Sequence, residues 1–177
     1  MNETLNLASI VEDSIVDGPG IRVTVFCQGC PHACPGCHNP QSHPFGTGTD
    51  LTVQEIYDVV QRSPLCRGVT FSGGEPFSQP EGFAALAQLL RGGGYEVACY
   101  TGYTFEQLQK NGTLEQQRLL ELLDVRVDGP FVLAQRDLSL RFRGSTNQRI
   151  LDVPRSLARG EATKYDGARW TGEDARC

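Results

Sequence analysis

The chain has 177 residues, the length of one domain with a buried core. Its formal net charge of −5 argues against general nucleic-acid binding. No window approaches the roughly 18 consecutive apolar residues of a membrane helix. The N-terminal segment MNETLNLASIVEDS lacks the basic and apolar regions of a secretory signal. We therefore expect a cytoplasmic protein with neither a membrane nor a nucleic acid as partner.

The chain contains seven cysteines. In a reducing compartment this number argues against a disulfide framework and favours metal or redox chemistry. The odd count also leaves at least one thiol unpaired.

Strand-like and helix-like runs alternate along the sequence. Residues 21–26 are apolar and β-branched, which predicts a first strand. Thr52 with Glu55 predicts a capping box at the start of a helix that runs to about Arg62. Further strands are predicted at 68–71, 95–100, 125–127 and 148–153, and further helices at 81–91, 104–110 and 115–123. Pro154 is expected to stop the last strand.

This alternation predicts an α/β fold with a mainly parallel sheet. There are too few units for a closed barrel of eight strands and eight helices, so a partial barrel or an open sheet remains. We expect a single domain over residues 1–177, with its core at about 5–153 and a poorly ordered, polar tail at 154–177.

Four unusual turns follow the predicted strands: the cysteine loop, SGGEP, TGY and DGP. Ligands of parallel α/β folds bind at the carboxyl ends of the strands. The four turns are therefore expected to form one shared site.

Four cysteines lie within eleven residues, in the segment FCQGCPHACPGCHNP. The last three have the spacing Cys30-x3-Cys34-x2-Cys37. Three thiolates on a short loop can hold a four-iron cluster and leave one iron open to a substrate. The alternative is a zinc site made from two CxxC pairs that begin at Cys27, although three residues between the pairs would crowd four tetrahedral ligands.

The SGGEP segment places two glycines at a strand end, where the backbone can approach a ligand closely. Its carbonyls, together with Glu75, are candidates to accept from a cationic amine. Taken alone, however, the segment is explained better by a plain β-turn followed by a proline. The same alternative stands for DGPG at residues 17–20 and for DGP at residues 128–130.

Residues 136–159 carry six arginines and only two acids. A solvated face accounts for this composition, and so does a site for an anion or a partner protein, because arginine pairs with carboxylates in bidentate fashion. Within the stretch, FRGSTNQR is denser in polar groups than a connecting loop requires.

The spacing of Cys30, Cys34 and Cys37, with GGE at residues 73–75, resembles the radical S-adenosylmethionine superfamily. The resemblance implies a partial (β/α) barrel that is open on one side. It implies that the three cysteines bind a 4Fe–4S cluster whose fourth iron is chelated by S-adenosylmethionine. One electron from the cluster then cleaves the cofactor to a 5′-deoxyadenosyl radical, and the GGE segment contacts the methionine amino group.

The stretch VDGPGIRVTVFCQGCPHACPGCHNP is similar to the activases of glycyl-radical enzymes. TGYT and VDGPF…FRGSTNQRI resemble the subgroup that activates anaerobic ribonucleotide reductase. The implied substrate is a glycine of that reductase, and the implied electron donor is a reduced flavodoxin or ferredoxin. An activase of the pyruvate formate-lyase type and a non-catalytic zinc-binding module remain alternatives.

One position departs from the superfamily pattern. Many members place an aromatic residue just before the third cysteine, where it packs on the adenine, and Gly36 stands at that position here. The resemblance to the activase subgroup implies a ring after the cysteine instead, and His38 occupies that place. Cys27 lies outside the motif and is expected to be structural, while Cys66, Cys99 and Cys177 have no assigned role. The candidate cofactor-binding residues are His38, Ser72, Gly73, Gly74, Glu75, Asp128 and Arg143.

Overall fold

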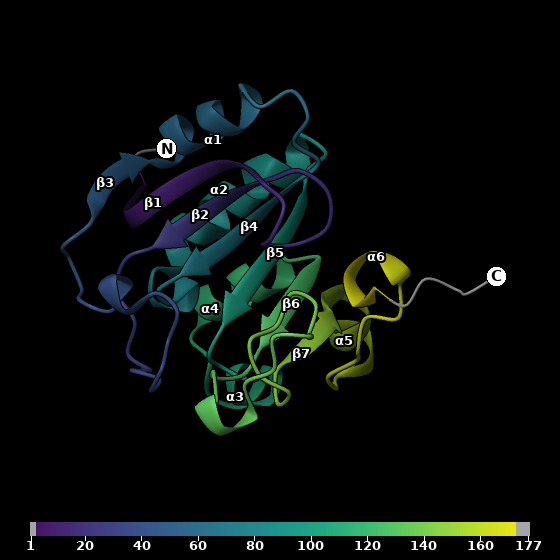
Figure 1. Cartoon of the computed structure of the whole chain (residues 1–177). Coiled ribbons are helices and arrows are strands. Elements are labelled where there is room, and N and C mark those ends of the chain that lie inside the picture. The colour runs from purple at the N-terminus through teal and green to yellow at the C-terminus, as the bar shows by residue number, and fades with distance from the viewer. Residues whose placement is uncertain (1–2, 173–177) are drawn as a thin grey trace.

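The computed structural model describes residues 3–172. One seven-stranded sheet organises them, with the strand order β3-β1-β2-β4-β5-β6-β7 (Figure 1). The strands are β1 (Thr4–Ser14), β2 (Arg22–Cys27), β3 (Thr49–Thr52), β4 (Gly68–Gly73), β5 (Glu96–Thr101), β6 (Val125–Asp128) and β7 (Arg149–Asp152).

The four central strands, β2, β4, β5 and β6, run parallel to one another. β1 is antiparallel to both β2 and β3, and β7 is antiparallel to β6. β3 and β7 are the two ends of the strand order and do not pair, so the sheet stays open. The prediction of an α/β fold with a mainly parallel, open sheet is confirmed.

Side chains that alternate along the strands build two cores. On β5, Val97 and Cys99 belong to the larger core, whereas Ala98 belongs to a smaller one, because successive side chains point to opposite faces of a sheet. The larger core packs under the helices, which are α1 (Val53–Gln61), α2 (Pro80–Gly92), α3 (Phe105–Asn111), α4 (Leu114–Glu121) and α5 (Val153–Arg159). The smaller core is closed by Trp170 of α6 (Ala168–Thr171).

Most of the predicted elements form within a few residues of their expected bounds. The capping box of α1 is present: Thr52 accepts a hydrogen bond from the Glu55 backbone N–H, and the Glu55 carboxylate accepts from the Thr52 N–H at 2.8 Å. The sequence did not predict β1 and β3. Most of the exposed positions of β1 carry polar or charged side chains, and its pairing with β2 and β3 decides its conformation.

The prediction of a poorly ordered tail is wrong for residues 154–172. Pro154 does not end an element; it lies in the first turn of α5, where its missing N–H costs no helix hydrogen bond. Further on, Trp170 is fully buried. Residues 173–177, with Cys177, lie outside the described residues. Within residues 3–172, no helix is long and apolar enough to cross a membrane.

The capping box generates a stability prediction. Thr52→Ala removes the side-chain acceptor of the α1 N-terminus, and we expect it to lower the free energy of unfolding by about 1 kcal/mol. Urea denaturation measures this difference. Thr47→Ala, in an exposed loop, is the control and should change the free energy much less. Equal losses in the two variants would contradict the assignment.

Candidate metal and cofactor site

A cavity of about 370 Å³ opens at the carboxyl ends of the parallel strands β2, β4 and β5. The prediction that unusual turns meet at these strand ends is borne out by its lining, which comes from the cysteine loop, the SGG turn, the β5 end and the 129–148 segment. The lining includes Cys30, Cys34, Cys37, His38, Ser72, Gly73, Gly74, Thr101, Gly129 and Arg143.

The three motif cysteines, Cys30, Cys34 and Cys37, are half-buried and all line this cavity. The loop that carries them is fixed where it begins, because the Cys30 N–H donates to the His43 carbonyl at 3.0 Å. Between the second and third cysteines, the Cys37 N–H donates to the Cys34 carbonyl at 3.1 Å. Burial raises the pKa of the Cys30 thiol. A metal centre that binds this thiol would therefore have to displace its proton.

Cys27 is not part of this group. Its side chain is fully buried, its Sγ accepts a hydrogen bond from Gln79 Nε2 at 3.1 Å, and burial raises its pKa to about 12. A zinc site with four thiolates would need this sulfur, which points into the core. Within residues 3–172, no three or more cysteine, histidine or acidic side chains converge to hold a single ion. A four-iron cluster suits the donor set better, since each thiolate binds a different iron.

The SGG turn pairs with the start of the cysteine loop. The Gly74 N–H donates to the Cys27 carbonyl and the Glu75 N–H to the Gly29 carbonyl, both at 2.8 Å. A Cβ on Gly74 would lie 2.3 Å from the Gly29 carbonyl oxygen, and Gly73 adopts a φ of +88°. The two glycines are therefore required for the close approach of two backbone segments.

Glu75 lies beneath the cavity rather than in its lining. Its carboxylate is fully buried. One oxygen accepts from the Phe77 N–H at 2.9 Å, the other accepts from the Gly102 N–H at 2.9 Å, and the Thr101 hydroxyl lies within 3.0 Å of both. These donors, together with His32, occupy the carboxylate oxygens of Glu75, to which a cofactor amine would otherwise have to donate.

His32, which the sequence did not identify as a site residue, completes this network. Its Nε2 lies 2.6 Å from a Glu75 carboxylate oxygen, and its ring packs edge-on against Tyr103 with the centroids 4.6 Å apart. A Cβ on Gly102 would lie 2.5 Å from the imidazole, so glycine leaves the space that the ring occupies. His32 stands between Cys30 and Cys34 and therefore ties the cysteine loop to the ends of β4 and β5.

His38 and Arg143 both line the cavity, and a cofactor contact by either stays a prediction. The His38 ring packs against Phe131 at a centroid distance of 5.3 Å. Arg143 donates from Nη1 to the Gln148 carbonyl at 3.0 Å, and its buried Nε has no hydrogen-bond partner among residues 3–172. Asn147 donates to the Pro130 carbonyl at 2.8 Å, which closes the loop on itself.

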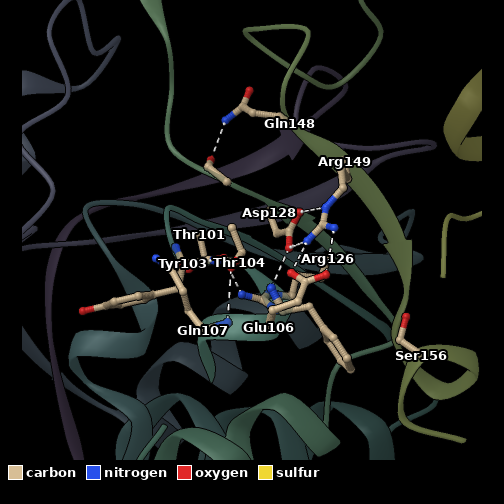
Figure 2. A network of polar contacts seen from close by, with 12 residues as sticks. Thr101, Tyr103, Thr104, Glu106, Gln107, Arg126, Asp128, Gln148, Arg149 and Ser156 are labelled. Atoms are coloured by element: carbon tan, nitrogen blue, oxygen red, sulfur yellow. Dashed lines mark hydrogen bonds and ion pairs between the residues drawn. The ribbon is translucent and has the colours of Figure 1, made fainter. Parts of the chain in front are cut away.

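Asp128 does not line the cavity, although its neighbour Gly129 does. The Asp128 carboxylate is fully buried and accepts from Arg149 Nε at 2.8 Å, from Arg149 Nη2 at 2.7 Å and from the Phe105 N–H at 2.8 Å (Figure 2). It joins β6 and β7 to the N-terminus of α3. A cofactor contact by Asp128 stays a prediction, and the arrangement gives this carboxylate a supporting role.

The arginines of the basic stretch at residues 136–159 have different partners and environments. Arg149 binds Asp128 and also Glu106, whose pKa falls to about 2 because the guanidinium donates to its carboxylate. Arg155 forms an exposed ion pair with Asp166 at 2.7 Å. Arg143 lines the cavity. The stretch is therefore not a uniform solvated face.

The chain matches the family described as "4Fe-4S single cluster domain" over residues 16–151. It is 37% identical, over 77% of its length and 90% of the relative, to the anaerobic ribonucleoside-triphosphate reductase-activating protein of Vibrio cholerae. It is 34% identical, over 82% of its length and 97% of the relative, to the protein of that name from Haemophilus influenzae. The pyruvate formate-lyase-activating enzyme of Listeria monocytogenes is 32% identical over 89% of this chain and 65% of that enzyme.

The fold, the cysteine cavity and these matches define a 4Fe–4S protein with one cluster domain. The chain belongs to the family of anaerobic ribonucleoside-triphosphate reductase-activating proteins.

The contact between His32 and Glu75 yields a prediction about cluster retention. His32→Ala removes a hydrogen bond to a buried carboxylate, which is worth about 1.5 kcal/mol. The cysteine loop should then open roughly tenfold more often and a reconstituted cluster should lose iron to a chelator correspondingly faster. Release is followed by the absorbance of the chelated iron.

His43→Ala is the matched control, because His43 supports the loop through its backbone carbonyl. It should retain iron like the wild type. Equal iron release from wild type and His32→Ala would show that the imidazole does not hold the loop.

The ion pair of Glu106 predicts a pH dependence. The pKa of this carboxyl lies at about 2 in the folded protein, below its ordinary value of 4.5, so its contribution to stability is present above pH 4.5 and is lost as the pH falls toward 2. Glu106→Gln should therefore destabilise the fold at pH 6 and do so less at pH 3. Urea midpoints over this range test it, with Glu81→Gln as the control. A difference that stays constant with pH would contradict the assignment.

Proposed function

We propose that this protein activates an anaerobic ribonucleoside-triphosphate reductase by generating a radical on one of its glycines. The observation that carries the proposal is the composition of one cavity: three cysteines with cluster spacing and a glycine-rich strand end line it together, while the fourth nearby cysteine lies in the core. The relatives that the chain matches over nearly their whole length carry the name of this activity.

The proposed cofactors are a 4Fe–4S cluster and S-adenosylmethionine. Cys30, Cys34 and Cys37 would hold the cluster and leave one iron without a protein ligand. When bound, the pair would supply one-electron cleavage of the sulfonium and so remove a hydrogen atom from the substrate glycine. The reductant is an external one-electron donor, a reduced flavodoxin or ferredoxin.

The remaining lining groups fit the parts of S-adenosylmethionine. Ser72, Gly73 and Gly74 line the cavity and would offer backbone carbonyls as acceptors for the amino group. Arg143 brings a positive charge with a free Nε–H, which suits a carboxylate. His38 presents a ring, supported by Phe131, against which adenine could stack.

The reductase is favoured over pyruvate formate-lyase as the partner. The chain covers 90% and 97% of two reductase-activating proteins, but only 65% of the pyruvate formate-lyase-activating enzyme. It therefore spans about two thirds of the latter. We place the protein in the cytoplasm, where such an electron donor and such a reductase would meet.

The cluster assignment makes a prediction about iron content. Alanine at Cys30, Cys34 or Cys37 should prevent anaerobic reconstitution of about four irons per chain, since each thiolate holds one corner of the cluster. Iron analysis and visible absorption measure this. Cys27→Ala, which removes a buried thiol of the same type, should still take up the cluster. Loss of the cluster in that variant, with retention in Cys37→Ala, would contradict the ligand set.

A second experiment tests the partner. The reduced, cluster-loaded protein is mixed with S-adenosylmethionine and either an anaerobic ribonucleotide reductase or a pyruvate formate-lyase. We expect the electron paramagnetic resonance signal of a glycyl radical with the reductase alone. A signal only with pyruvate formate-lyase would assign the alternative activity, and a signal with neither would overturn the proposal.

A further inference from the structure

Two parts of the cavity wall come from distant positions in the sequence. Val16 and Asp17 precede β2, whereas Phe142 and Arg143 follow β6. Neither part belongs to a strand or a helix, so contacts with other elements fix their positions. The sheet supplies some of these contacts, because Thr24 and Thr70 donate to Asp17 and the Tyr100 hydroxyl donates to the Phe142 carbonyl.

Trp170 lies behind both. Its side chain is fully buried, and its ring centroid is 5.4 Å from that of Phe142 in an edge-on arrangement. A Cβ on Gly18 would lie 2.8 Å from the indole, so the turn next to Asp17 packs directly on the ring. The Arg22 guanidinium stands 5.3 Å from the ring centroid. One side chain thus touches Phe142 in one part of the wall and Gly18, the residue next to the other part.

The segment that carries Trp170 is firmly attached to the sheet. The Tyr165 N–H donates to the Ile150 carbonyl at 2.9 Å, and the Asp152 N–H donates to the Thr163 carbonyl at 3.0 Å, which extends the sheet beyond β7. Arg169 pairs with Glu96 at the start of β5. Figure 1 shows α6, in yellow, at the end of the molecule that holds β6, β7 and α5.

The match to the single-cluster family ends at residue 151, before this segment. Its packing is nevertheless continuous with the sheet, because Trp170 shares a hydrophobic cluster with Ala98, Val127 and Ile150. The segment therefore packs on the matched domain, next to the two wall segments.

We propose that residues 163–172 form the outer support of the cofactor cavity, with Trp170 as a positioning residue that holds the 16–18 turn and Phe142 in place. The inference rests on the proposed function, because it takes the cavity as the S-adenosylmethionine site. Removal of the ring leaves a hole that both wall segments can relax into, and a less preorganised cavity binds its ligand more weakly. The indole N–H has no hydrogen-bond partner within residues 3–172, so the effect depends on ring packing and phenylalanine should replace it.

The test measures binding of S-adenosylhomocysteine, a probe that is not cleaved, to cluster-loaded protein by calorimetry. We expect Trp170→Leu to weaken binding about tenfold, which corresponds to 1.4 kcal/mol, with iron content unchanged. Trp170→Phe should stay close to wild type. Phe83→Leu, which opens a hole in the core on the other face of the sheet, is the matched control and should also bind normally.

The outcomes separate the two claims. Normal binding by Trp170→Leu, when wild type binds the probe, overturns the inference alone. Failure of the wild-type protein to bind the probe overturns the proposed function, and the inference with it.

A second measurement needs no variant. Hydrogen exchange of wild-type, cluster-loaded protein should slow in residues 163–172 and 16–18 when the probe binds, and stay unchanged in α1. Exchange in residues 163–172 that does not respond to the probe overturns the inference.

Discussion

The carboxylate of Glu75 is the interaction on which the site depends. Burying a carboxylate is costly unless donors surround it, and here the donors come from three separate segments. Phe77 donates from the turn after β4, Thr101 and Gly102 from the end of β5, and His32 from the cysteine loop. The fold cannot satisfy this charge without bringing two strand ends and the cysteine loop together. The cavity exists because that condition is met.

A buried carboxylate also draws donors together at the end of β6. Asp128 at the end of β6 is also fully buried, and its donors are Arg149 on β7 and the first N–H of α3 (Figure 2). Glu75 and Asp128 therefore organise the frame and lie outside the lining of the cavity. The glycines of the SGG turn and the three motif cysteines face the cavity, together with Arg143.

Features whose residues lie close together in the sequence could be predicted from it. Features that depend on contacts between distant residues could not. The capping box at Thr52 was predictable because all its partners lie within three residues. That the three motif cysteines line one cavity was predictable because one short loop carries all of them. The role of His32 was not, since its partner lies 43 residues away. The burial of Trp170 was not predicted, because the segment around it is polar and contains glycines. Its burial depends on tertiary packing against residues of the sheet.

Transfer of hydrogen from the substrate glycine to the cofactor tests the central claim most directly. An anaerobic ribonucleotide reductase is prepared with deuterium at the α-carbons of its glycines and is mixed with the reduced, cluster-loaded protein and unlabelled S-adenosylmethionine. The account predicts that the 5′-deoxyadenosine formed carries one deuterium for each glycyl radical produced. Unlabelled 5′-deoxyadenosine in the presence of a glycyl radical would contradict it.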